Sequence, residues 1–133
     1  MVDTNVILRA LIKGSRVRGL LLSPKHQFYI PEYALEETKK HVLVVRRKTG
    51  LSEDEVERLF DILLTNLRVL PARKVAPKLE ETLKLMRSID SKDAPFVAAA
   101  LGGECDGIWS DDADLKRQSR VRVWNTKEMM SLL

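Results

Sequence analysis

The stretch Val2-Asp3-Thr4-Asn5-Val6-Ile7-Leu8 begins the chain and decides how the rest of the sequence is interpreted. Its apolar residues predict a short buried strand that ends near Asp3 and continues through a turn into a helix. Asp is common in ordinary turns, but it is an awkward choice beside the strongly apolar run of residues 6–8. We therefore expect Asp3 to have a functional role at the end of the first strand.

The remainder of the chain alternates between predicted strands and predicted helices. Four further strands are expected at residues 28–30, 67–70, 107–110 and 121–124. Helices are expected between them, at about residues 15–22, 32–47, 53–64, 79–86 and 96–101, with a short helix at the carboxyl end. Strands and helices in alternation predict an α/β fold with a parallel sheet flanked by helices. A length of 133 residues fits a single domain, residues 1–133.

Composition and charge limit the classes of function. Apolar residues make up 44% and charged residues 32%, which is typical of a folded protein, and no apolar run is long enough to span a membrane. Cys105 is the only cysteine, so an internal disulfide and a thiolate zinc site are excluded, and a reducing cytoplasm is expected. The net charge of +4 suggests a polyanionic partner such as nucleic acid, but on charge alone a well-solvated surface explains it better.

Acidic residues recur where predicted strands give way to the segments that follow them. They are Asp3, Glu36, Glu37, Asp93, Asp111, Asp112 and Asp114. The carboxyl ends of parallel strands share one edge of a sheet, so these side chains are expected to converge there. Converged carboxylates favour Mg²⁺ or Mn²⁺, which can activate water for attack on a phosphodiester. Each acid also has an ordinary explanation: a turn, a solvated helix face, a helix cap or a polar loop.

Four segments, taken in order, resemble the motifs of the PIN-domain nucleases. They are residues 2–8, 30–37, 90–101 and 106–115, and the resemblance extends over essentially the whole chain. It implies a PIN-like three-layer α/β/α sandwich around a central, mostly parallel five-stranded sheet. It also implies dependence on Mg²⁺ or Mn²⁺ and cleavage of single-stranded RNA. Many members of that family are toxins of toxin–antitoxin pairs, and many are homodimers.

The resemblance also assigns roles to individual acids. The catalytic, metal-binding acids carried over from the motifs are Asp3, Glu37, Asp93 and Asp112, and Asp114 is expected to complete the metal site. Asp90 is a weaker candidate, and Thr4, Asn5 and Ser110 are polar neighbours that could orient the carboxylates or serve only as turn and cap residues. The chain departs from the family pattern because only two residues precede Asp3, so the first strand is expected to be clipped.

The sequence therefore predicts a metal-dependent endoribonuclease that hydrolyses RNA and leaves a 5′-phosphate. A role as the toxin of a toxin–antitoxin pair, with an antitoxin protein as partner and a homodimeric assembly, goes with this prediction. Basic residues that could line the approach of the RNA follow the first and last acids: Arg9, Lys13, Arg16, Arg18, Lys116, Arg117, Arg120 and Arg122. The alternative is an RNA- or protein-binding module with little or no nuclease activity.

Two other metal-dependent folds are disfavoured by single positions. A phosphatase resembling the haloacid dehalogenases needs a second acid two residues after the first, and this chain has Asn5 there. A phosphoacceptor receiver domain needs an Asp at the end of a central strand near residue 50, where the sequence reads Lys48-Thr49-Gly50.

Overall fold

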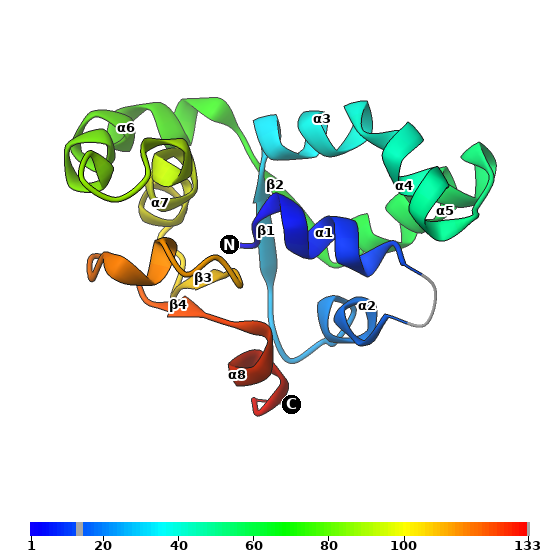
Figure 1. Ribbon diagram of the computed structural model, residues 1–133. Helices are drawn as coiled ribbons and strands as arrows, with labels where there is room; N and C mark the ends of the chain where they lie inside the picture. Colours follow the sequence, from blue (N-terminus) through cyan, green and yellow to red (C-terminus); the bar gives the residue numbers. More distant parts are fainter. Residues whose placement is uncertain (13–14, 133) are drawn as a thin grey trace.

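Helices and short parallel strands alternate along the chain in the computed structural model, which describes residues 1–12 and 15–132. The elements in order are α1 (Thr4–Ala10), α2 (Arg16–Leu21), β1 (Phe28–Pro31), α3 (Glu32–Lys40), α4 (Val42–Thr49), α5 (Glu53–Leu64), β2 (Leu67–Leu70), α6 (Ala72–Met86), the 3₁₀ helix η1 (Ser91–Asp93), α7 (Ala94–Gly102), β3 (Ile108–Trp109), the 3₁₀ helix η2 (Leu115–Arg117), β4 (Val123–Trp124) and α8 (Thr126–Met130). The protein is therefore a mixed α/β structure, as predicted (Figure 1).

The strands form two small parallel sheets rather than the single five-stranded sheet that the sequence predicted. β1 pairs with β2 in the register Phe28↔Leu67 to Pro31↔Leu70, and β3 pairs with β4 in the register Ile108↔Val123. The expectation of five strands in one sheet is wrong for the described part of the chain. The predicted strands at 107–110 and 121–124 each shorten to two residues, so that they pair over too little length to extend a sheet.

The amino-terminal segment lies between the two sheets and bonds to both. The amide of Val2 donates to the carbonyl of Tyr29 at 2.9 Å, and the amide of Trp109 donates to the carbonyl of Met1 at 2.7 Å. This segment forms only an isolated parallel bridge, between Val2 and Trp109, because the chain enters α1 directly after Asp3. Asp3 is thereby held beside the carboxyl ends of β1 and β3, and Figure 1 shows the amino terminus between these strands.

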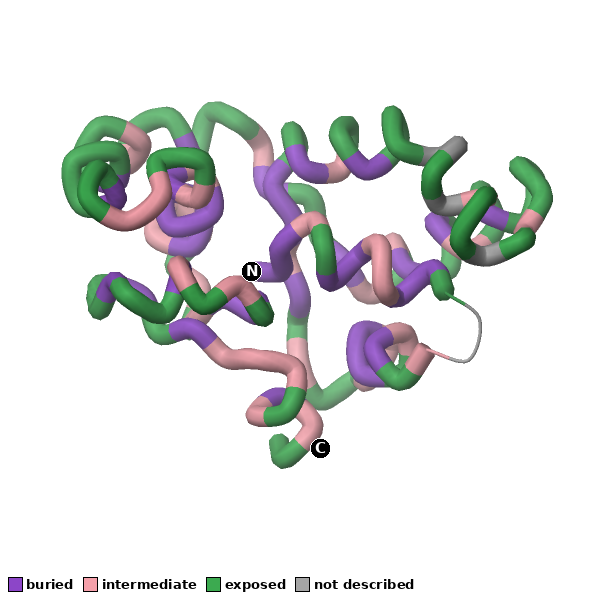
Figure 2. Tube along the Cα trace, viewed as in Figure 1, coloured by how far each residue is buried: buried purple, intermediate pink, exposed green. Residues whose placement is uncertain are grey.

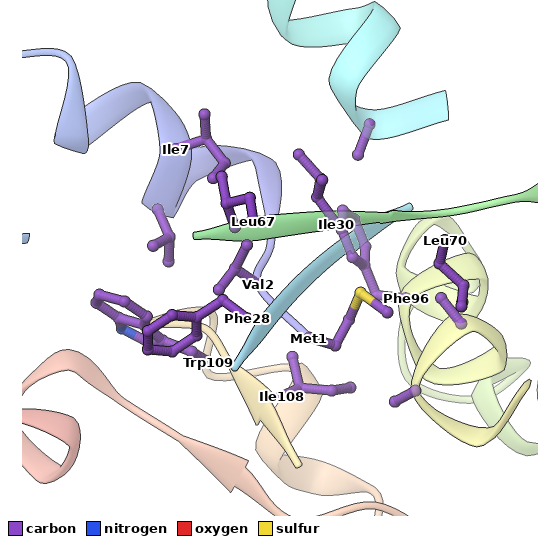
Figure 3. Close-up of a cluster of buried hydrophobic side chains, with 14 of the residues drawn as sticks. Met1, Val2, Ile7, Phe28, Ile30, Leu67, Leu70, Phe96, Ile108 and Trp109 are labelled. Atoms are coloured by element: carbon purple, nitrogen blue, oxygen red, sulfur yellow. The ribbon is translucent and has the colours of Figure 1, made fainter. Parts of the chain in front are cut away.

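The core surrounds the two sheets and the inner faces of α1 and α7. Buried positions gather along β1, α1 and α7, whereas the outer faces of α5 and α6 are exposed (Figure 2). Figure 3 shows side chains from both sheets and from α1 and α7 meeting in this cluster. The rings of Phe28 and Trp109 lie 5.5 Å apart, and this contact joins β1 to β3.

α6 and α7 pack closely enough to exclude a side chain at one position. A Cβ atom on Gly102 would lie 1.9 Å from the carbonyl oxygen of Lys74, so the α7 backbone rests directly on that of α6. α7 is almost entirely buried. The close approach at Gly102 fixes the carboxyl end of this helix, whereas Asp93 stands at its amino end. Within the part of the chain that the structure describes, no helix is both long and apolar enough to cross a membrane.

Some helix boundaries differ from the sequence-based expectation, among them that of α6, which begins at Ala72 rather than near residue 79. The helix predicted over residues 32–47 is two helices, α3 and α4, because His41 leaves the helical conformation with φ −93° and ψ 18°. Ser15 stands before α2 as predicted, but its side chain makes no capping hydrogen bond. The predicted capping box is confirmed, because Ser52 and Glu55 exchange side-chain and backbone hydrogen bonds at the start of α5.

Candidate metal centre

Asp3 is held in place by hydrogen bonds to both of its carboxylate oxygens. Oδ1 caps α1 by accepting from the Val6 amide at 2.9 Å, and Oδ2 accepts from the hydroxyl of Ser110. Burial raises the pKa of Asp3 above its ordinary value, although both hydrogen bonds act in the opposite direction. Asp3 therefore serves as a helix cap, the ordinary explanation, and is also aimed at the segment that follows β3.

Ser110 connects Asp3 to a second predicted acid. Its buried Oγ donates to Asp3 and accepts from the backbone amide of Asp112 at 3.0 Å. One hydroxyl thus links the end of the amino-terminal segment to the loop after β3. Because each carboxylate oxygen has more than one acceptor direction, these bonds leave Asp3 able to accept a further partner.

Asp93 is an acid whose side-chain hydrogen bonding is incomplete among the described residues. It occupies the N-cap position of α7, but among the residues that the structure describes its side chain makes no capping hydrogen bond and its buried Oδ2 has no hydrogen-bond partner. The pKa of Asp93 is raised to about 7, first by burial, then by the carboxylate of Asp112 within hydrogen-bonding contact, and further by Asp90 and Asp3. Helix capping therefore does not explain this side chain.

Glu37 lies at the rim of the cluster, on α3. Its side chain is 59% exposed, and its Oε2 lies 3.9 Å from Nε2 of His41. Its closeness to the other acids is visible through Tyr33, whose pKa is raised by burial and then by the charges of Asp93, Glu37 and Asp3. The charges that act on Tyr33 include that of Glu37 and not that of its neighbour Glu36.

The three aspartates after β3 have different surroundings. Asp111 accepts hydrogen bonds from Arg9 and from the amide of Thr126, the latter at 2.7 Å. Partial burial would raise the pKa of Asp111, but the hydrogen bonds from Thr126 and Arg9 outweigh burial and lower it. Asp111 is thus occupied within the protein, whereas Asp112 faces Asp93.

Asp114 is turned partly away from the cluster. Its backbone amide donates to Oδ1 of Asp112 at 2.9 Å, which positions the Asp112 carboxylate. Its side chain lies 3.7 Å from the guanidinium of Arg117. Asp90 caps η1 by accepting from the Lys92 amide at 3.0 Å. The structure therefore places Asp112 in contact with Asp93, connects Asp3 to the Asp112 backbone through Ser110, and leaves Glu37 at the rim. Asp90 and Asp114 help to shape the backbone.

Most of the basic residues predicted to face RNA have partners within the protein. Arg18 donates to the carbonyls of Ala10 and Ile12, at 2.7 and 3.0 Å, and so caps the end of α1. The others pair as Arg9 with Asp111, Lys116 with Glu128, Arg117 with Asp114, Arg120 with Glu81, and Arg122 over the ring of Trp124. Arg16 is exposed, and Lys13 lies outside the described residues. Most of the basic side chains predicted to line the path of the RNA are therefore engaged in intramolecular contacts.

The side chains present are of the type that binds a divalent cation, but they are not gathered as closely as a complete cation site requires. Carboxylate oxygens are the ligands that Mg²⁺ and Mn²⁺ prefer, and the buried Oδ2 of Asp93 has no hydrogen-bond partner in the described part of the chain. Across residues 1–12 and 15–132, however, no three acidic, histidine or cysteine side chains are gathered closely enough to hold an ion. The fit thus rests on the Asp93–Asp112 pair and the orphaned oxygen.

A cleft in the protein lies away from these acids. It measures about 460 Å³ and is lined at the amino ends of β1 and β3 by residues that include Phe28, Gly107 and Trp124. None of the five predicted metal-binding acids lines it. The acids lie at the opposite, carboxyl ends of the strands, which is the usual place for ligands in parallel α/β sheets.

Two residues at the site were not identified from the sequence. Tyr33 stands four residues before Glu37, so helical periodicity puts both on one face of α3, a signal that could have found it. Thr126 supports Asp111 through its amide and also accepts from Arg9 at 3.1 Å, a contact between segments 117 residues apart. No local sequence signal indicates that second relationship.

Comparison with known proteins adds one finding to this geometry. A family model described as PIN domain matches residues 1–133. The match includes the first acid, the α3 acids, the start of α7 and the loop after β3. No curated protein is similar enough to the chain to count as a match.

Proposed function

The chain belongs to the PIN-domain family, whose members are generally nucleases, and on that premise we propose that it is a Mg²⁺- or Mn²⁺-dependent endoribonuclease that cleaves single-stranded RNA. Nucleases of this family generally use divalent metal ions. The proposal extends to phosphodiester hydrolysis that leaves a 5′-phosphate.

The observation that carries the proposal is the Asp93–Asp112 pair. Two carboxylates in contact repel each other, and here one of them also has a buried oxygen without a hydrogen-bond partner. A divalent cation would relieve both the repulsion and the missing partner. A helix cap or a solvated surface would require neither feature, so the pair favours a site that holds a cation.

In this proposal each acid has a distinct part. Asp3, Asp93 and Asp112 would hold the cation, with Glu37 reaching it from the rim, directly or through water, and with Asp114 as a further ligand. A bound Mg²⁺ or Mn²⁺ would supply activation of water and stabilisation of the charge on the phosphoryl oxygen. Ser110 would keep Asp3 and the Asp112 loop in register, since its hydroxyl bonds to both.

The biological setting is proposed from the family resemblance. We place the protein as the toxin of a toxin–antitoxin pair in the cytoplasm, with an antitoxin protein as partner and a homodimer as the assembly. The single cysteine is compatible with a reducing compartment.

The proposal is tested by incubating a labelled single-stranded RNA with the protein in Mg²⁺ or Mn²⁺. Asp3→Asn, Asp112→Asn and an EDTA sample should each abolish cleavage. Asp111→Asn is the matched control, because Asp111 adjoins Asp112 in sequence but is held by Arg9 and Thr126. Cleavage should persist in this control, and equal cleavage by the Asp112→Asn variant and the parent would refute the carboxylate mechanism.

A second candidate function is an RNA- or protein-binding module on the PIN scaffold with little or no activity. The observation that favours it is that the described acids do not assemble into a group of three or more ligands. A calorimetric titration with Mn²⁺, compared with the cleavage assay, separates the two candidates. Metal binding or RNA binding without cleavage would favour the binding module, and metal-dependent cleavage would exclude it.

A further inference from the structure

An exposed aromatic ring stands beside the carboxylates and has no part in the chemistry assigned so far. The chain has seven aromatic residues, Phe, Tyr and Trp together, and all of them lie in the described part. Tyr33 is the exposed one, with 36% of its surface accessible. A large planar side chain at the rim of a proposed nuclease site is available to a substrate as well as to the core.

The position of Tyr33 is set by two helices. On α3 it lies one turn before Glu37, so both side chains project from the same face. Across the site its ring centroid is 5.6 Å from that of Phe96, with the planes tilted by 59°. Phe96 is on α7, three residues after Asp93. The ring pair therefore joins the helices that carry Glu37 and Asp93.

The two rings of this pair differ in accessibility. Phe96 is buried and belongs to the cluster of side chains around β1 and β2 (Figure 3). It supports Tyr33 from the core side and leaves part of the Tyr33 ring facing solvent. An aromatic ring that contacts a buried ring and is itself partly exposed is a suitable stacking surface for a second planar group.

The phenol also lies close to the acids. Burial, and after it the charges of Asp93, Glu37 and Asp3 in that order, raise the pKa of the Tyr33 phenol. A planar group stacked on the Tyr33 ring would therefore lie next to the carboxylates that would hold the cation. In an RNA chain the group adjacent to a phosphodiester is a nucleobase.

We propose that Tyr33 is a stacking platform for the nucleobase next to the phosphodiester that is cut, and that it selects unpaired over paired RNA. This inference rests on the proposed ribonuclease function. An unpaired base can turn its π face toward an aromatic side chain, whereas a base within a duplex is already covered by its neighbours. Stacking tolerates any base, so it requires no sequence motif in the substrate.

A merely structural role for Tyr33 makes a different prediction. If the ring only covers Phe96, an aliphatic side chain of similar size would do the same, and substrate binding would not depend on the π face. Tyr33→Phe keeps the ring and removes the hydroxyl. Tyr33→Leu keeps an apolar cover and removes the ring, so this pair separates stacking from packing.

The experiment measures RNA binding by the full chain carrying Asp112→Asn, so that cleavage does not interfere. The probe is a single-stranded RNA of about ten nucleotides with 2-aminopurine placed at each position in turn, beside a duplex of the same sequence. With Tyr33 or with Tyr33→Phe, one position should show quenched fluorescence. Tyr33→Leu should lose that quenching, weaken single-strand affinity by about 5- to 150-fold, and change duplex affinity little.

Controls and contrary outcomes complete the test. Tyr29→Leu removes the other tyrosine, which lines the cleft at the opposite ends of the strands, and should leave RNA affinity unchanged. If Tyr33→Leu fails to fold by circular dichroism, Tyr33→Met supplies a second non-aromatic variant. Equal affinity and equal quenching with and without the ring would overturn the inference and leave the ribonuclease proposal intact. No RNA binding by the parent would overturn both.

Discussion

The hydroxyl of Ser110 donates a hydrogen bond to the carboxylate of Asp3, although 107 residues separate them in the sequence. The same oxygen accepts from the amide of Asp112, so one small side chain fixes the spacing between two of the proposed metal-binding acids. Both Ser110 and Asp3 are buried, which excludes water as an easy substitute for either bond.

Ser110→Ala should therefore reduce both stability and activity. A buried carboxylate oxygen and a backbone amide would each lose a partner, at a cost of about 1–3 kcal/mol in the free energy of unfolding. Metal affinity or RNA cleavage should fall by roughly 10- to 100-fold, as when supports of metal ligands are removed. Urea unfolding and a Mn²⁺-dependent cleavage assay measure the two effects. The exposed Ser88→Ala is the control, and an equally small change in both variants would show that the bridge is unimportant.

Asp93 should make the stability of the metal-free protein depend on pH. Its pKa is raised from an ordinary 3.8 to about 7 in the folded state. Between these values the unfolded chain gives up a proton that the folded protein retains, so the free energy of unfolding falls as pH rises through this window. Below the window the contribution is fully present, and above about pH 7 it is lost.

Urea titrations in EDTA at several pH values check this sign. Asp93→Asn should remove part of the downward slope, while the exposed Asp61→Asn should keep it. Other acids titrate in the same range, so the difference between parent and variant is the quantity to compare. Parallel pH curves for the parent and Asp93→Asn would contradict the raised pKa. Added Mn²⁺ should restore stability to the parent at neutral pH and not to Asp93→Asn.

Two glycine substitutions should have opposite effects on stability. Gly102→Ala places a Cβ 1.9 Å from the Lys74 carbonyl oxygen, so α6 and α7 must separate, at a cost of about 1–3 kcal/mol or more. Gly19→Ala lies inside α2 with nothing within 4 Å of the new atom, and should stabilise by up to about 1 kcal/mol through helix propensity. Thermal melting of both variants is the measurement, and a stabilised Gly102→Ala would refute the close helix contact.

Substitutions at Arg18 and Arg16 should distinguish an arginine that stabilises the fold from one that is free to contact nucleic acid. Arg18→Gln removes donors to the carbonyls of Ala10 and Ile12 and should lower the melting temperature. Arg16→Gln should leave the melting temperature unchanged; if Arg16 contacts phosphate, the slope of log affinity against log salt should fall by about one. Affinity for RNA at several salt concentrations decides the second point, and an unchanged slope would remove Arg16 from the RNA path.

Local signals predicted much of the fold because they depend on neighbours in the sequence. The apolar runs at Phe28 and Leu67 predicted β1 and β2, and the Ser52–Glu55 pair predicted the start of α5. Local signals did not predict how strands would join. Pairing at β3 and β4 extends for only two residues, and the amino-terminal segment makes a single bridge. Sheet extent depends on contacts between distant segments, which single-sequence patterns do not carry.

The sequence by itself determined which acids to consider, because the expected strand ends put seven acids near one edge of a sheet, and the resemblance to the PIN-domain motifs selected Asp3, Glu37, Asp93 and Asp112 from them. Only the tertiary structure gave a physical difference between Asp112, which the motif had selected, and Asp111. The first faces Asp93, and the second is held by Arg9 and Thr126. Adjacent residues of one type carry the same local signal, whereas burial, hydrogen bonding and charge depend on what the fold brings against each of them. The unpaired oxygen of Asp93 is likewise a property of its surroundings.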